Sequence, residues 1–374
     1  MDEFALGDRA LLDAPGRALL ISRTPRRPAP GTPWVRAIRD AVAASAAAGE
    51  ALVTGLGRDP FDLALAACRE AGGAAVVVLQ DTFERDPFVN EARAWLPERH
   101  LLVAPERPDE TLFRAERLAA RDRRIGALAR RASVLHIREG GNMERAAADL
   151  AARGVSLDLS FQLPNLDAPT HRAPGLGVRF RAFENWNALT HYTREPDGAW
   201  PDEPRAAYLG WLLDGRPDET RTGLDALRRI LAMRRILGSG RLMSARTPLV
   251  SFTARAPHDL PELLRWRKGL RRWTFRPYGI AIRREALADL GARAVRYLHD
   301  AGLKALAPED RLFAQKHAPP ETDWTGEAEW RLRGDLDLAA LPSGSWRALV
   351  PTRAEAAALE SASGSAVAWL ARDP

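Results

Sequence analysis

Short apolar segments alternate with segments of helical spacing through the first 160 residues of the chain. Strand-length apolar segments lie at residues 17–22, 51–54, 74–79, 100–104, 133–137 and 155–159. Between them, the spacing of apolar residues predicts helices at residues 33–48, 60–71, within 110–131 and at 142–152. Residues 74–79 are apolar without interruption, which is typical of a strand buried on both faces of a parallel sheet. The alternation predicts an α/β fold with a doubly wound parallel sheet.

Turns that contain glycine and arginine follow several of these predicted strands. In a doubly wound sheet, ligands bind outside the carboxyl ends of the strands, where such turns meet. Glycines allow close backbone approach at helix starts, where amide donors and the helix dipole favour an anion, and arginines add fork-shaped contacts. We therefore expect a phosphate-bearing nucleotide here, although the glycines also suit plain tight turns. The candidate residues are Ser22, Arg23, Gly55, Gly57, Arg58, Arg121, Gly140, Gly141 and Asn142.

Residues 15–160 resemble the Rossmann-like domain of the DNA-processing Smf/DprA family. The resemblance rests on the segments at residues 21–25, 54–62 and 121–129 and on the turn Gly140-Gly-Asn142. The wider SLOG-type superfamily includes nucleotide phosphoribohydrolases and sensor domains of anti-phage proteins, so the resemblance implies nucleotide recognition. The opening Gly-Ser of the family is replaced here by Ile21-Ser22, and the phosphoribohydrolase signature is reduced to Gly140-Gly-Asn-Met-Glu144. Ligand binding is therefore expected of this half in place of catalysis.

Three short motifs stand in order in the second half of the chain. They are His191-Tyr192-Thr193, Ser251-Phe252-Thr253 and Glu327-Ala328-Glu329. A His-Tyr pair, a Ser/Thr-aromatic-Thr strand and a Glu-x-Glu, in this order, resemble the H-Y-E form of the ADP-ribosyltransferase fold. That fold is an α+β split sheet that holds NAD⁺ and breaks its nicotinamide–ribose bond. Each motif alone is common in structural segments, so the resemblance depends on their order and strand-like settings.

The resemblance implies a role for each of these residues. A histidine would bond the adenosine-side ribose, and an aromatic face would cover the nicotinamide. Glu329 would stabilise the cationic ribosyl as nicotinamide leaves, and Glu327 would support it by orienting the acceptor. NAD is then the substrate, and the acceptor of ADP-ribose is a nucleic acid, a protein or water. The expected NAD-binding residues are His191, Tyr192, Thr193, Ser251, Phe252, Thr253 and Tyr278.

Residues 251–349 also resemble a group of bacterial abortive-infection proteins. The shared text is Ser251-Phe-Thr253 together with the segments at residues 277–280, 291–297 and 324–331. The resemblance implies a toxic defence effector that consumes NAD and is gated by a nucleotide-sensing first domain. The alternative is a non-catalytic nucleotide- or nucleic-acid-binding protein whose second module is degenerate.

A chain of 374 residues suits two domains. Residues 164–177 contain several prolines and glycines without an apolar period and are typical of a linker. We therefore expect a nucleotide-binding domain at residues 1–164, a linker at 165–178 and a transferase-like domain at 179–374. Helices are also expected at residues 206–213 and 224–233, followed by a strand at 346–350 and a helix at 353–361.

The chain is basic, with a formal net charge of +6 and a pI near 10. This charge is compatible with a nucleic-acid partner. The densest basic cluster, residues 265–273, contains two tryptophans and either stacks bases or forms the solvated rim of a helix whose tryptophans face the core.

Several features indicate a cytoplasmic protein without a metal. The apolar runs are shorter than a membrane span, and the acidic start of the chain lacks the plan of a signal peptide. Cys68 is the only cysteine, so an internal disulfide is excluded. The seven histidines are scattered without metal-binding spacing.

Overall fold

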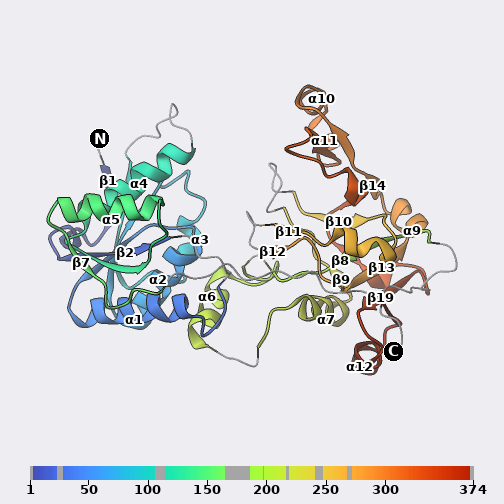
Figure 1. Ribbon diagram of the computed structural model, residues 1–374, viewed down its shortest axis with the longest axis horizontal. Helices are drawn as coiled ribbons and strands as arrows, with labels where there is room; N and C mark the ends of the chain where they lie inside the picture. The colour runs from blue at the N-terminus through green and yellow to red at the C-terminus, as the bar shows by residue number, and fades with distance from the viewer. Residues whose placement is uncertain are drawn as a thin grey trace. The chain divides into compact units, whose positions relative to one another are not determined.

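The protein divides into two compact units (Figure 1). A computed structural model describes residues 3–22, 28–105, 114–164, 186–196, 198–215, 219–240, 247–267 and 272–370. The first unit contains Met1–Pro169 and Glu203–Glu219, and the second contains Thr170–Asp202 and Thr220–Pro374. The chain therefore leaves the second unit after residue 202, contributes one segment to the first unit and then returns. The expected linker, residues 165–178, lies outside the described residues.

A seven-stranded sheet of order β1-β5-β4-β3-β2-β6-β7 forms the centre of the first unit. Its strands are β1 (Glu3–Gly7), β2 (Gly16–Ile21), β3 (Ala51–Thr54), β4 (Ala74–Val78), β5 (Arg99–Pro105), β6 (Arg131–His136) and β7 (Ser156–Asp158). All neighbouring pairs from β2 to β7 are parallel, and only the edge strand β1 is antiparallel. The predicted α/β fold with a parallel sheet is confirmed for this half, and β1 is an addition that the sequence analysis did not predict.

Helices cover both faces of this sheet (Figure 1). They are α1 (Pro33–Ala47), α2 (Asp59–Glu70), α3 (Val89–Ala92), α4 (Arg114–Leu128), α5 (Asn142–Ala152) and α6 (Arg205–Asp214), with a 3₁₀ turn at Arg9–Leu12. Ile125 of α4 and Leu150 of α5 pack with Val76 and Val103 in one cluster. The alternate residue Val77 is equally buried, as expected for a strand covered on both faces. Helix α6 packs against α1 and α2, although its residues follow the first strand of the second unit.

The second unit is an α+β fold around a seven-stranded sheet of order β14-β17-β10-β8-β13-β19-β20. Its strands are β8 (Ala188–Tyr192), β10 (Leu249–Thr253), β13 (Gly279–Arg283), β14 (Arg293–Ala294), β17 (Glu329–Arg333), β19 (Trp346–Val350) and β20 (Val367–Trp369). Only β19 and β20 pair in parallel. Short ladders join β9 (Arg235–Ile236) to β18 (Leu336–Asp337), β11 (Trp266–Arg267) to β12 (Arg272–Trp273) and β15 (Arg296–Leu298) to β16 (Ala314–Lys316). The ADP-ribosyltransferase-like split sheet stays a prediction.

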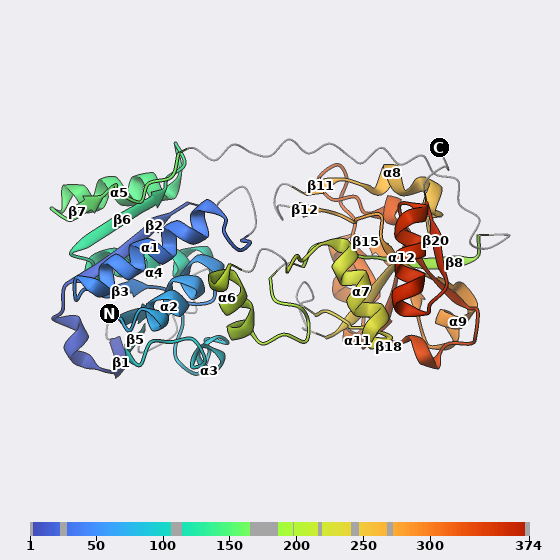
Figure 2. The same ribbon diagram turned by 90° about the horizontal axis from the view of Figure 1, so that it is seen from below.

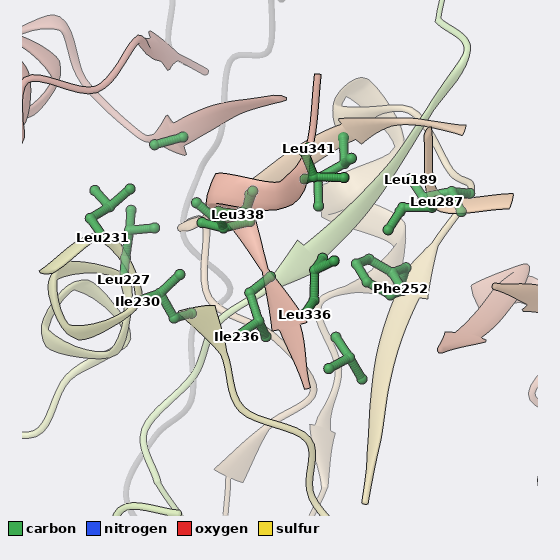
Figure 3. Close-up of a cluster of buried hydrophobic side chains, with 14 of the residues drawn as sticks. Leu189, Leu227, Ile230, Leu231, Ile236, Phe252, Leu287, Leu336, Leu338 and Leu341 are labelled. Atoms are coloured by element: carbon green, nitrogen blue, oxygen red, sulfur yellow. The ribbon is translucent and has the colours of Figure 1, made fainter. Parts of the chain in front are cut away.

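Two longer helices, α7 (Gly223–Met233) and α12 (Arg353–Ser363), lie side by side in this unit (Figure 2). Their apolar residues join a cluster with strand residues Leu189 and Phe252 (Figure 3). Both helices start with a capping box, at Thr222 and Thr352, which satisfies amides of their first turns. Smaller helices are α8 (Leu260–Leu263), α9 (Arg284–Asp289), α10 (Asp300–Ala305) and α11 (Pro308–Arg311), with 3₁₀ turns at Pro257–Asp259, Thr325–Glu327 and Leu338–Ala340.

Most elements expected in this half are present, and one alternative is wrong. The helices expected at residues 206–213 and 224–233 correspond to α6 and α7. The basic cluster at residues 265–273 was expected to form the rim of a helix in one interpretation. Its described residues form β11 and β12 instead, because Trp266 and Trp273 face each other across an antiparallel ladder and bury their rings edge to face. Among the described residues, no helix has the length and apolar character needed to cross a membrane.

Candidate functional site

The three motifs of the second half lie on adjacent strands. Strand β10 pairs with β17 on one side and with β8 on the other. Thr253 is therefore opposite both Glu329 and Thr190. Strand β8 also pairs with β13, which begins directly after Tyr278. The tertiary fold thus brings residues that are far apart in the sequence into one part of the sheet.

Pairing register assigns the motif residues to opposite faces of this sheet. Directly opposed residues share a face, and successive residues alternate between faces. Ser251 and Thr253 share a face with Arg331 and Glu329, and we call this the carboxylate face. His191 and Phe252 lie on the other face, which we call the histidine face, with their ring centroids 6.0 Å apart. The structure therefore does not bring His191 and Glu329 onto one face.

The two tyrosines of the predicted site are also separated. Tyr192 is buried on the carboxylate face in a cluster with Leu260, Trp273 and Leu349. Tyr278 packs against the core of the histidine face, and its hydroxyl donates to Glu355 at 2.9 Å. Neither ring is free to cover a nicotinamide beside Glu329 in this conformation.

Arg331 holds the carboxylate of Glu329 from two residues further along β17. Its Nε and Nη2 donate to the two carboxylate oxygens, each at 2.9 Å. Its remaining donors reach the carbonyls of Leu312 and Ala314 at 2.9 and 3.1 Å and the Gln315 side chain at 2.8 Å. All five N–H donors of this buried guanidinium therefore have acceptors. A forked pair of this kind fixes the orientation of a carboxylate as well as its position.

Glu327 has a different environment. Its backbone carbonyl accepts from the Thr253 hydroxyl at 2.6 Å, which ties the Glu-x-Glu segment to β10. The side chain has an ion-pair contact with Arg267 at 3.5 Å. Burial, followed by the like charge of Glu329, raises the pKa of Glu327. One carboxylate of the pair is thus held by a fixed cation and the other accepts a proton more readily, an asymmetry that permits separate chemical roles.

A small cavity lies beside Glu327. Its volume is about 20 Å³, which is room for about one water molecule. The guanidinium of Arg267 stacks on the ring of Trp324, with 4.0 Å between its central carbon and the ring centroid. The cavity is lined by Leu263, Arg265, Arg267, Asp323, Trp324, Gly326 and Glu327. The sequence analysis did not assign Arg267, Trp324 or Arg331 to the site. Arg267 lies in the basic cluster at residues 265–273, and Trp324 and Arg331 lie in the segment 324–331 that resembles abortive-infection proteins.

His191 is suited to accept a hydrogen bond from a ligand. Its Nδ1 lies 2.9 Å from the carbonyl oxygen of Ser251. Because a carbonyl only accepts, Nδ1 carries the proton and Nε2 is left as an acceptor. Burial, aided by the charge of Arg194 and opposed by the bond to Ser251, lowers the pKa of His191 to about 4. Thr193, the third residue of this motif, is buried and donates from its hydroxyl to the Gly223 carbonyl at 2.6 Å, so it anchors the start of α7.

In the first unit, the order of strands reverses between β2 and β6. The chain runs from β2 through β3 and β4 to β5 on one side and then returns to place β6 on the other. Ligands of open α/β sheets bind at such a switch point. Ser22 connects the two strand ends, because its amide donates to the His136 carbonyl at 2.6 Å and its hydroxyl accepts from the Arg138 amide at 3.0 Å. Arg23, another predicted ligand residue, lies outside the described residues.

Two backbone amides that were expected to bind phosphate instead donate hydrogen bonds to carboxylates of the protein itself. The Gly57 amide donates to Asp62 and the Gly140 amide donates to Glu144, each at 2.8 Å. Both glycines have positive φ, of 79° and 67°, which glycine tolerates without strain. Burial raises the pKa of Asp62 to about 6, although Arg205 and the Gly57 amide act in the opposite direction.

The remaining predicted residues of the first unit surround these turns. Arg58 is the N-cap residue of α2, and Gly141 is the N-cap residue of α5, which begins at Asn142. Gly55 leaves no room for a side chain, because a Cβ there would lie 2.9 Å from the ring of Phe61. Arg121 is buried, and the central carbon of its guanidinium lies 4.7 Å from the centroid of that ring. It therefore packs beneath the turn after β3 and is not open to solvent. Within the described ranges, no three His, Cys, Asp or Glu side chains are placed to hold a metal ion.

Comparison with known proteins found little similarity. No protein-family model matches the chain, and no curated protein matches its sequence. DNA processing protein A from Streptococcus pneumoniae is similar to 41% of this chain and 53% of its own length, with 19% identity and a TM-score of 0.34. DNA processing protein A from Helicobacter pylori, whose structure is described as giving insight into its single-stranded DNA binding mode, is also similar to part of the chain. The similarity covers 41% of this chain and 69% of that protein, with 18% identity and a TM-score of 0.33. This chain thus spans about half the length of the first structure, and these TM-scores are too low to establish a shared fold.

Proposed function

We propose that the second unit breaks the nicotinamide–ribose bond of NAD⁺, as an ADP-ribosyltransferase or an NAD glycohydrolase. The observation that carries the proposal is the pair of Glu329, which lies on the carboxylate face, and Glu327, which lines the cavity together with Trp324. A carboxylate held in one orientation stabilises the cationic ribosyl that develops as neutral nicotinamide departs. The order of the three sequence motifs, which resembles that of ADP-ribosyltransferases, supports the same chemistry.

The geometry favours a different division of roles from the one that the motifs implied. Ser251 is exposed on the carboxylate face, where it can meet a ribose or phosphate oxygen. His191 lies on the opposite face and is not expected to share a pocket with Glu329. In this proposal, substrate binding therefore depends on the carboxylate face alone.

The proposal is tested by incubating the purified full chain with NAD⁺ and measuring nicotinamide release. Wild type is expected to release nicotinamide, and Glu329→Gln to be slower by about 10²–10³-fold, a typical loss for a preorganised group that meets developing charge. Glu321→Gln, an exposed carboxylate in the loop before the site, is the matched control and should behave as wild type. Equal rates for wild type and Glu329→Gln, or no release by wild type, would reject the proposal.

A second candidate is a binding protein without catalysis. Two observations favour it: both oxygens of Glu329 already bond Arg331, and the cavity beside Glu327 has room for about one water molecule. In that case the first unit would bind a nucleotide or nucleic acid and the second would be an interaction module. Calorimetric binding of nucleotides to the full chain, without any NAD⁺ turnover, would favour this candidate over the first.

We extend the first proposal to a defence effector that is gated by a nucleotide bound at the switch point of the first unit. This extension is supported only by the sequence resemblance to abortive-infection proteins, which is a family analogy. Expression of the full chain should then arrest bacterial growth, whereas the Glu329→Gln chain should not. Harmless expression of both chains, with phage present and absent, would point to another biological role.

A further inference from the structure

A planar cation of the protein itself lines the cavity beside Glu327. The central carbon of the Arg267 guanidinium lies over the Trp324 ring, 4.0 Å from its centroid, and the guanidinium contacts the Glu327 carboxylate at 3.5 Å. An aromatic face and a carboxylate together are a general recognition pattern for flat cations. Arg267 ends the short strand β11.

Arg267 is held much less firmly than Arg331. All five donors of Arg331 are satisfied, whereas the Nε of Arg267 is buried without a hydrogen-bond partner among the described residues. Its ion pair with Glu327 is long for a charge-assisted hydrogen bond. Burial and the neighbouring charge of Arg265 lower the pKa of Arg267, so its charged form is poorly accommodated. Arg267 therefore has fewer hydrogen bonds to lose on displacement than Arg331.

We propose that Arg267 is an internal occupant of a binding subsite for a planar cationic ring. The subsite consists of the Trp324 face and the Glu327 carboxylate, and an entering ring displaces Arg267. The identification of that ring as the pyridinium of NAD⁺ rests on the proposed function, but the recognition chemistry does not. Trp324 then takes the ring-covering role that the resemblance had assigned to an aromatic residue of the motifs.

The subsite then has two states: a closed state, in which Arg267 covers Trp324, and an open state, in which Arg267 has moved away. A ligand that binds only the open state has its apparent affinity reduced by the fraction of molecules in that state. Removing the internal cation should therefore tighten binding of a planar cation without adding any contact. An uncharged ring should gain less, because only a cation also benefits from the loss of a repelling charge and from an unpaired Glu327.

The test uses 1-methylnicotinamide, a planar pyridinium cation without a ribose bond to break, and neutral nicotinamide as the comparison ligand. Calorimetry on the full chain should show that Arg267→Ala binds 1-methylnicotinamide at least about fivefold more tightly than wild type. Arg265→Ala is the matched control, because it removes one positive charge from the same cavity lining without vacating the Trp324 face. Its gain should be smaller, and neutral nicotinamide should gain less from Arg267→Ala than 1-methylnicotinamide does.

Adding Trp324→Leu to Arg267→Ala should abolish the gain. Arg267→Gln keeps the length of the side chain without its charge, and it replaces Arg267→Ala if the latter does not melt like wild type. Unchanged or weaker binding of 1-methylnicotinamide by the Arg267 variants would overturn the inference, even if the protein cleaves NAD⁺. Tighter binding without NAD⁺ cleavage would instead retain the subsite and overturn the proposed function.

Discussion

At the scale of single residues, two neighbouring glutamates of the second unit have different arginine partners. Glu329 faces a guanidinium whose donors are all satisfied, and Glu327 faces one that is poorly held. The difference depends on a pairing of β17 with β10 and on the carbonyls of Leu312 and Ala314, which are distant in the sequence. A motif such as Glu-x-Glu can be recognised in a sequence, whereas the cations that distinguish its members cannot.

Arg331→Lys should slow nicotinamide release by about 10²-fold, because lysine keeps the charge but cannot hold both oxygens, and small misplacement of a catalytic group has costs of this size. If Arg331 acts through Glu329, the same change in a Glu329→Gln chain should have little further effect, because groups acting as a unit are not additive. Arg333→Lys, exposed on the same strand, is the control. Losses that simply multiply in the double variant would contradict the assignment.

His191 should make the stability of the second unit depend on pH. Its folded pKa of about 4 is below the usual 6.5, so the unfolded chain binds more protons and stability rises with pH between these values. Lowering the pH from 7 to 5 should therefore cost about 2 kcal/mol through this residue. Urea unfolding at both pH values should show this loss in wild type, and a smaller one in His191→Gln. Equal losses in the two proteins would mean that the folded chain does not hold His191 in its neutral form.

At the scale of secondary structure, local signals predicted the α/β alternation of the first unit and missed what depends on distant partners. The apolar period identified most strands and helices, because an element buried against a sheet has apolar residues at regular spacing along its own sequence. Helix α6 was predicted as a helix, but its membership of the first unit was not. That membership depends on Arg205, whose partner Asp62 lies 143 positions away in the sequence. Side-chain pairing at such a distance leaves no local pattern.

Arg205→Ala should destabilise the first unit by about 3 kcal/mol, because it leaves the buried carboxylate of Asp62 without its cation. The control is Arg99→Ala, which breaks a solvent-exposed pair with Asp8 and should cost less than about 1 kcal/mol. The measurement is urea unfolding followed by a probe of the first unit. Similar losses for the two variants would show that the pair with Asp62 contributes no more than a surface contact.

At the scale of the whole molecule, the pair between Arg205 and Asp62 connects the turn after β3 to a segment that continues from β8. Asp62 also holds the Gly57 amide, at which a phosphate was expected to bind. A ligand at that turn must compete with Asp62, so its binding should disturb Arg205 and α6. A ligand can shift the second unit only through different affinities for two states, and we expect this competition to be the source of such a difference.

We therefore expect a nucleotide that binds the first unit to change the rate of nicotinamide release by the intact chain. ADP-ribose and cyclic nucleotides are suitable probes, with binding measured by calorimetry and release measured in parallel. In Arg205→Ala the ligand should still bind but should no longer change the rate. A ligand effect of the same size in that variant would show that coupling does not pass through α6.

The order in which the chain visits the two units limits how they can be exchanged by gene recombination. Two genes joined end to end give a polypeptide that passes once from one domain to the next. This chain passes three times, because Glu203–Glu219 belongs to the first unit while the residues on both sides belong to the second. Neither unit can therefore be exchanged by recombination at a single crossover. A chimaera that replaces the first unit must also bring its own version of the inserted helix.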